Sequence, residues 1–234
     1  MERVVSGGLK ETAQRYGVVL ADETAATLES YCRLLWDWNA KINLTRHADF
    51  EKFASRDLVD CAALCRFIEK GENVLDVGSG GGVPGVVLAL LRPDLRVTVC
   101  ESVGKKAKVL EDIIGRLSLP VRHRHARAED LLKGGEGERF STLTVRAVAK
   151  MKKLLGWFNP YWDRFDRLLL VKGPGWVEER AEARHFGHLG KAIALRKLDE
   201  YPLRGTDANG VILQLCPKSR LLGEPWKLRN ECAD

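Results

Sequence analysis

Val74-Leu75-Asp76-Val77-Gly78-Ser79-Gly80-Gly81-Gly82-Val83-Pro84-Gly85 is the stretch that decides the fold of this chain. The apolar run 74–77 is typical of a short buried parallel strand. Five glycines within the next eight positions allow a sharp turn and a close approach to a bound molecule, because a Cβ would collide there. Pro84 suits a helix's first turn, and the apolar run 86–91 continues that helix. Strand, glycine loop and helix in this order predict the ligand-binding turn of a doubly wound α/β domain.

Two acidic residues narrow the class of ligand that the glycine loop suits. Gly80-x-Gly82-x-x-Gly85 matches a dinucleotide fingerprint only formally, and a P-loop is excluded because no Gly-Lys-Ser/Thr ends the loop. Asp76 lies inside the first strand, and Glu101 ends the next apolar run, 23 residues after the first glycine, where an acid meets ribose hydroxyls. Asp-x-Gly-x-Gly-x-Gly resembles motif I of class I S-adenosylmethionine methyltransferases. The alternative is a glycine-rich turn with no ligand, which five glycines beside two acids disfavour.

Composition sets the outer bounds of the interpretation. With 234 residues, 45% of them hydrophobic and 30% charged, the chain fits one soluble α/β domain with an extension. No apolar stretch reaches the length of a membrane span, and the N-terminus has no signal-peptide pattern, so we expect a cytoplasmic protein without a membrane partner. The six cysteines are scattered without zinc-ligand spacing, so we expect buried reduced thiols and no metal site.

The net charge of +6 suits a polyanionic partner without proving one. Lysines cluster at 105–108 and at 150–153, in segments that follow the second and fourth expected strands. Such segments emerge at the carboxyl edge of a doubly wound sheet, where ligands bind, so a nucleic-acid face is favoured over plain solvation. The basic run 122–127 falls on the third expected strand, where a solvated sheet edge is an equal alternative.

The periodicity of apolar residues predicts three parts: a helical extension over 1–70, a methyltransferase-like domain over 71–216 and a basic tail over 217–234. From residue 73 onward strands and helices alternate, which implies a mostly parallel sheet covered on both faces. The seven expected strands are 73–77, 95–101, 120–124, 140–146, 166–172, 191–198 and 210–216. The turn-rich segment 204–210 predicts that the last two form an antiparallel hairpin. We expect a monomer.

Six ordered motifs resemble one methyltransferase family. They are Trp38-Asn39 with Asn43-Leu44-Thr45, Arg56-Asp57-Leu58-Val59-Asp60, Asp76 to Gly85 with its Val-Pro-Gly ending, Glu101-Ser102 with Lys105-Lys106, Arg127-Ala128-Glu129, and Arg146-Ala147, followed by Lys172-Gly173. The chain resembles the RsmG family, also called glucose-inhibited division protein B. The resemblance implies a Rossmann-like class I fold, S-adenosylmethionine as cofactor, and methylation of N7 of a guanine in bacterial small-subunit (16S) rRNA, with rRNA or the small subunit as partner.

The resemblance also implies residue roles. Cofactor binding falls to Gly78, Gly80, Gly82, Val83, Glu101 at the ribose, Ala128 and Glu129 against the adenine, and Arg146. Arg146 is also the catalytic candidate, beside the methionine end and the incoming base. Glu129 has an alternative as an acid at a helix start, and Asp76 has one as a structural carboxylate that accepts N–H groups of the loop.

The expected chemistry asks little of the protein. Guanine N7 is an unprotonated acceptor, so no base must remove a proton before methyl transfer. Positioning alone can supply about 7–11 kcal/mol of the acceleration. We therefore expect no catalytic dyad. Lys172 is open to two interpretations, contact with phosphate or base, or a structural ion pair.

Some positions depart from the family pattern. Asp57 stands where His is usual, Val145 where Ser is usual, and Asn209 opens the last strand where Arg is common. These departures lie outside the glycine loop, so they leave the cofactor class better supported than the acceptor. Two alternatives remain open: a class I methyltransferase that acts on another RNA, a small molecule or a protein, and a non-catalytic module that binds adenosylmethionine.

Overall fold

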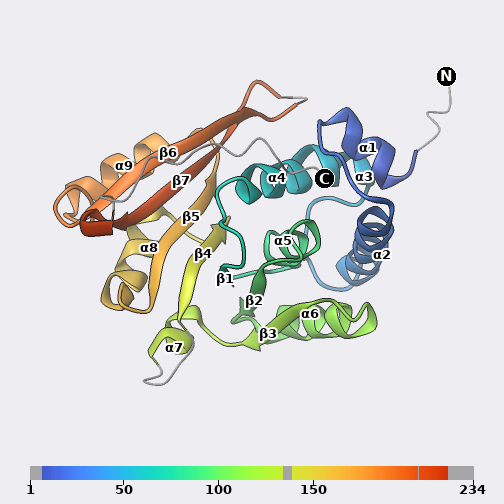
Figure 1. Ribbon diagram of the computed structural model, residues 1–234, viewed down its shortest axis with the longest axis horizontal. Coiled ribbons are helices and arrows are strands. Elements are labelled where there is room, and N and C mark those ends of the chain that lie inside the picture. Colours follow the sequence, from blue (N-terminus) through green and yellow to red (C-terminus); the bar gives the residue numbers. More distant parts are fainter. Residues whose placement is uncertain (1–6, 134–138, 205, 221–234) are drawn as a thin grey trace.

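A computed structural model describes residues 7–133, 139–204 and 206–220, and one seven-stranded sheet runs through them (Figure 1). The strand order is β3-β2-β1-β4-β5-β7-β6, and only β7 runs antiparallel to its neighbours. The bounds are β1 Asn73–Val77, β2 Arg96–Glu101, β3 Val121–His125, β4 Phe140–Arg146, β5 Phe165–Lys172, β6 Ile193–Pro202 and β7 Asn209–Pro217. The expected mostly parallel, doubly wound sheet with a closing hairpin is confirmed.

Helices cover both faces of the sheet (Figure 1). One face carries α1 Leu9–Arg15, α2 Asp22–Asn39, α3 Phe50–Lys52, a π-helical turn Phe53–Leu58 (η1), α4 Val59–Cys65, α5 Gly85–Leu91 and α6 Gly104–Arg116. The other face carries α7 Ala128–Lys133, α8 Met151–Phe158 and α9 Trp176–His185, and short 3-10 turns occupy Asn159–Tyr161 and Lys218–Arg220. Each face therefore has its own hydrophobic cluster, as expected for a sheet buried on both sides.

Strand β1 lies inside the sheet, between β2 and β4, and all five of its residues are buried. Its last residue, Val77, pairs in register with Cys100 of β2 and Val145 of β4. The carboxyl ends of three neighbouring strands consequently meet at one edge. The glycine loop, Glu101 and Arg146 all leave the sheet at this edge, which is where open α/β sheets bind ligands.

The helical segment before β1 shares a core with the sheet domain. Leu28 and Leu35 of α2 belong to the same buried cluster as Leu88 of α5 and Leu110 of α6. The indole Nε1 of Trp38 donates to Asp112 Oδ2 at 2.8 Å, which ties the end of α2 to α6. The boundary near residue 70 remains a prediction, because these contacts do not show whether either part folds alone.

One expectation near the C-terminus needed adjustment. Strand β6 runs four residues beyond the expected 191–198, because a bulge between Lys197 and Asp199 interrupts the apolar alternation without ending the strand. The basic tail over 217–234 stays a prediction; in the structure Pro217 ends β7 and a 3-10 turn follows it. The remainder of the expected tail, 221–234, lies outside the described residues.

The cysteines and helices add two simple findings. Cys32, Cys61, Cys100 and Cys216 are buried free thiols, Cys65 is also buried, and Cys232 lies outside the described residues. Within the described residues no helix combines the length and the apolar character that crossing a membrane requires.

Leu35 tests the packing of α2 against the glycine loop. A Cβ added to Gly81 would lie only 2.9 Å from Leu35 Cδ1, so Leu35 packs directly on the loop. Leu35 is 2% exposed. We expect Leu35→Ala to lower the free energy of unfolding by about 2–5 kcal/mol, because it opens a cavity. Urea denaturation measures this change. Val19→Ala is the control, because Val19 is 71% exposed, and its effect should stay within about 0.5 kcal/mol. Equal effects for both variants would contradict the packing.

Candidate functional site

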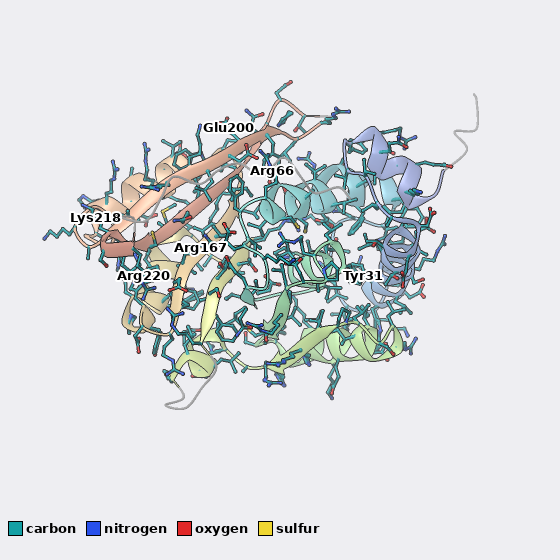
Figure 2. The ribbon with its side chains drawn as sticks, in the orientation of Figure 1. Tyr31, Arg66, Arg167, Glu200, Lys218 and Arg220 are labelled. Carbon is teal, nitrogen blue, oxygen red and sulfur yellow. The ribbon has the colours of Figure 1, made fainter. Side chains whose placement is uncertain are left out.

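The glycine loop holds a backbone path that other residues rarely adopt. Gly78, Gly80 and Gly82 have φ values of 64°, 57° and 107°. A Cβ on Gly82 would lie 2.8 Å from Val86 and 3.1 Å from the Tyr31 hydroxyl, so both conformation and space require glycine there. The Tyr31 hydroxyl donates to the carbonyl of Gly81 at 2.7 Å and anchors the loop to α2 (Figure 2). This role of Tyr31 was not predicted, because the sequence showed only that Tyr31 falls on the apolar face of a helix.

Asp76 is a structural carboxylate beneath the loop. Its side chain is 0% exposed, Oδ2 accepts from the N–H of Gly85 at 3.1 Å, and Oδ1 accepts from Thr144 Oγ1 at 2.9 Å. Burial raises the pKa of Asp76 to about 6, against the opposing effect of these hydrogen bonds. The carboxylate therefore joins β1, the start of α5 and β4, which is the structural alternative that the sequence left open.

Glu101 is fixed at the end of β2 by the backbone around it. Its side chain accepts from the N–H of Gly80 at 3.0 Å through Oε2 and from the N–H of Val103 at 2.8 Å through Oε1. Each carboxylate oxygen has a second acceptor position, so hydroxyl donors can still bind. A pinned carboxylate beside a glycine loop can bind two neighbouring hydroxyl groups without first losing side-chain freedom.

The remaining expected cofactor residues lie around the same edge. Ala128 and Glu129 open α7 directly after β3, whose last residue His125 pairs with Glu101. Ala128 is 4% exposed and Glu129 is half-buried, and both interpretations of Glu129 stay open. Val83 is half-buried against the cluster on the α2 face.

Arg146 ends β4 between two buried carboxylates. Its Nη2 donates to Asp57 Oδ1 at 2.5 Å and its Nε donates to Asp60 Oδ2 at 2.8 Å. Burial opposes ionisation of Asp57, but hydrogen bonding from His47 and the charge of Arg146 outweigh it and lower the pKa of Asp57. Burial raises the pKa of Asp60 despite Arg146. Asp57, a departure from the family pattern, is thus a direct partner of the catalytic candidate.

Two further side chains extend this ion-pair group. His47 Nδ1 lies 3.0 Å from Asp57 Oδ2, and the Tyr201 hydroxyl donates to Asp60 Oδ1 at 2.7 Å. The structure therefore contains a His–carboxylate pair, while the absence of a catalytic dyad stays a prediction. No local pattern predicted this pair, because His47 lies in the loop before α3 and meets Asp57 of η1 only in the folded chain. Asp57 is shared with Arg146, so the pair is part of a larger charged group.

The ion-pair group of Arg146, Asp57, Asp60, His47 and Tyr201 lies next to the glycine loop. Ala147 adopts a φ of 56°. A Cβ added to Gly78 would lie only 2.9 Å from the side chain of Val148, the next residue. The turn after β4 is therefore packed directly on the first glycine of the loop. Any molecule held by the loop at this edge would have Arg146 in its surroundings.

Lys172 and the other two departures have structural partners. Lys172 Nζ lies 2.8 Å from Glu179 Oε2 and donates to the carbonyl of Ala149 at 2.9 Å, which is the ion pair that one interpretation expected. Val145 is 1% exposed and belongs to the core cluster on the α8 face. Asn209 starts β7, and its Nδ2 donates to Glu200 Oε1 at 2.9 Å. In the described parts of the chain, no three His, Cys, Asp or Glu side chains gather as a metal ion would require.

The sheet order and the glycine loop define a class I methyltransferase fold. The chain is similar to the O-methyltransferase from Bacillus cereus, solved in complex with SAH, at a TM-score of 0.58 and 16% identity over 90% of this chain and 98% of that one. Residues 24–195 match the GidB family, described as rRNA small subunit methyltransferase G. The chain belongs to this family of methyltransferases.

Curated relatives agree with this assignment. The chain is 44% identical to Ribosomal RNA small subunit methyltransferase G of Rhodopirellula baltica, over 93% of this chain and 100% of that protein. It is 32% identical to the protein of the same name in Clostridium perfringens strain 13, over 86% of this chain and 85% of that one. The family resemblance found from the motifs is confirmed.

The buried Asp76 predicts a distinct pH dependence of stability. Its pKa of about 6 in the folded protein lies above its ordinary value of 3.8, so folded protein binds the proton more tightly than unfolded chain does. Its contribution to stability is full below about pH 4 and is lost as the pH rises through 6, at a cost of about 3 kcal/mol. We expect Asp76→Asn, which can keep both hydrogen bonds, to remove this loss.

Urea denaturation of both proteins between pH 4 and pH 8 measures the effect. The difference in unfolding free energy between Asp76→Asn and the unchanged protein should grow in favour of the variant as the pH rises to 7. A difference that does not vary with pH would show that Asp76 keeps an ordinary pKa.

Proposed function

We propose that this protein transfers the methyl group of S-adenosylmethionine to N7 of a guanine in small-subunit (16S) rRNA. The family assignment carries the proposal, and the glycine loop with the pinned Glu101 at the carboxyl edge supports it. We assign cofactor binding to the residues that the family resemblance implied, namely Gly78, Gly80, Gly82, Val83, Glu101, Ala128, Glu129 and Arg146. We also assign the role of catalytic residue to Arg146.

The residues at this edge fit the proposed cofactor. The loop leaves its glycine positions without side chains, so its backbone can approach the methionine portion closely. The free acceptor positions of Glu101 suit the two ribose hydroxyls. Val103 lies two residues after the end of β2 and is half exposed, so it adds apolar surface beside the Glu101 carboxylate. S-adenosylmethionine would supply a methyl group bonded to a sulfonium sulfur. The sulfur leaves as a neutral thioether, so the transfer needs no proton movement.

The chemistry of guanine N7 explains why methyl transfer needs no general base. Guanine N7 carries a free lone pair, so the protein has only to orient the base and exclude competing nucleophiles. Arg146 is held in one orientation by Asp57 and Asp60, and its guanidinium can donate to O6 of a guanine, beside the reacting N7. The His47–Asp57 pair then serves to hold Asp57 rather than to remove a proton.

A basic rim at the carboxyl edge supports rRNA as the partner. Lys105 near the start of α6 and Lys150 before α8 are both exposed, and the segments that contain them follow β2 and β4. Arg122 and Arg124 are exposed on β3, the outermost strand on that side. Cationic side chains in these places suit phosphate contacts that do not depend on base sequence. We propose that the protein acts as a cytoplasmic monomer on this RNA.

The experiment that tests the function is transfer of labelled methyl groups to small-subunit particles and to naked rRNA. We expect label in 7-methylguanosine, identified by mass after nuclease digestion. Glu101→Gln should reduce S-adenosylmethionine affinity by about 10- to 100-fold, because its amide would face N–H donors in place of an acceptor oxygen. Glu178→Gln on the exposed part of α9 is the matched control and should bind as the unchanged protein does.

The outcomes separate the alternatives. Label in another nucleoside would reject N7 of guanine as the acceptor and keep the cofactor and RNA as substrates. Binding of S-adenosylmethionine without label in RNA would reject the rRNA acceptor and favour a small molecule or protein. Absence of binding would reject the cofactor.

The basic rim predicts a salt-dependent contact with RNA. We expect Lys105→Ala and Lys150→Ala each to lower rRNA affinity and to reduce the slope of log affinity against log salt by about 0.7–1, because each loses one phosphate contact. Filter binding at several salt concentrations measures the slope. Lys70→Ala is the matched control, because Lys70 is exposed before β1, at the opposite edge of the sheet. An equal change in the control would show that net charge, and not the rim, governs binding.

A further inference from the structure

Strand β6 changes the face of the sheet toward which its side chains point. Ile193 and Leu195 belong with the cluster on the α8 and α9 face, whereas Tyr201, six residues after Leu195 and so expected on the same face, belongs with the cluster on the opposite face. The register shift between Lys197 and Asp199 accounts for this change, because one extra residue reverses the alternation of all later side chains. The bulge therefore determines that Tyr201 points toward α4.

The partner strand leaves room for the ring of Tyr201. Tyr201 pairs with Gly210 of β7, and a Cβ on Gly210 would lie 2.5 Å from Tyr201 Cε2. Any larger residue at 210 would push the ring away from its present place. Together the bulge and Gly210 direct the Tyr201 hydroxyl to Asp60 Oδ1, at 2.7 Å.

Asp60 connects Tyr201 to Arg146. Its Oδ1 accepts from Tyr201, and its Oδ2 accepts from Nε of Arg146 at 2.8 Å. We propose that Tyr201, directed by the bulge in β6 and the space at Gly210, is a positioning residue that fixes Arg146 through Asp60 for methyl transfer. This inference rests on the proposed function, because it gives Tyr201 its role through the role of Arg146.

The groups that face Asp60 define what Tyr201 contributes. Arg146 approaches from β4, Asp57 from η1 and Tyr201 from β6, and the neighbouring Cys61 thiol is neutral because burial raises its pKa. Burial raises the pKa of Asp60, while Arg146 and the Tyr201 hydroxyl lower it. Burial also raises the pKa of Tyr201, so its hydroxyl stays a donor. Loss of that donor makes Asp60 take up a proton at a higher pH, and a neutral Asp60 holds Arg146 less firmly.

Tyr201→Phe removes the hydroxyl and keeps the ring. We expect the acid limb of the methyl-transfer rate to move to higher pH, with kcat about 10-fold lower at pH 6 and close to that of the unchanged protein at pH 9. The KM for RNA should stay the same, since Tyr201 does not belong to the basic rim. Gly210→Ala is the second variant, because its Cβ displaces the ring, and it should move the same limb in the same direction.

Asp199→Asn is the matched control. Asp199 Oδ2 accepts from Nη1 of Arg66, at the end of α4, at 2.8 Å, so Asp199 joins the same hairpin to α4 through a different partner from Asp60. This control should leave the acid limb in place. Thermal unfolding of all three variants confirms that they are folded.

Two results would overturn the positioning role. One is a Tyr201→Phe profile that is unchanged or lowered equally at every pH, and the other is an equal shift in Asp199→Asn. The pH dependence of S-adenosylmethionine binding, measured by calorimetry, provides a readout without RNA, and Tyr201→Phe should weaken it only at low pH. If the unchanged protein binds the cofactor but methylates no rRNA, the proposed acceptor fails while this readout still decides the role of Tyr201.

Discussion

The buried carboxylate of Asp76 is the contact on which the arrangement of the site depends. It accepts from the N–H of Gly85 at the start of α5 and from the hydroxyl of Thr144 in β4, so one side chain joins three elements beneath the glycine loop. A carboxyl group without exposure is stable only when its oxygens are hydrogen-bonded, and it meets that condition here. A Cβ on Gly85 would lie 2.5 Å from Val99, so the helix can start this close to the strands only at a glycine.

Above that support, charge is arranged in two different ways. Glu101 is held by the backbone N–H groups of Gly80 and Val103, which leaves a second acceptor position on each carboxylate oxygen for a ligand. Arg146 is held by two carboxylates, and removal of either would leave a buried charge with fewer partners. The first arrangement suits binding and the second suits orientation. Both follow from the general cost of burying charge without partners.

Local patterns predicted the fold well because they depend on neighbouring residues. The run 73–77 matched its strand without error, and the glycine loop, the helix after it and the acid ending β2 were all found from spacing. Strand β6 was predicted too short because its bulge breaks the apolar alternation that marks a strand. The sequence left two roles open for Asp76, ligand binding and structural support of the loop. Its contacts with Gly85 and Thr144 favour the structural role.

The sequence by itself determined the order of strands and helices, the glycine loop and the family, since each rests on composition and spacing over a few tens of residues. Only the tertiary structure decided the partners of Arg146, because Asp60 and Asp57 lie 86 and 89 residues away along the chain. It likewise decided the contact of Tyr201 with Asp60, across 141 residues. No local pattern records such pairs. They arise because parallel strands bring their carboxyl ends to one edge, and because a single extra residue in β6 turns Tyr201 toward the face of the sheet that carries α4.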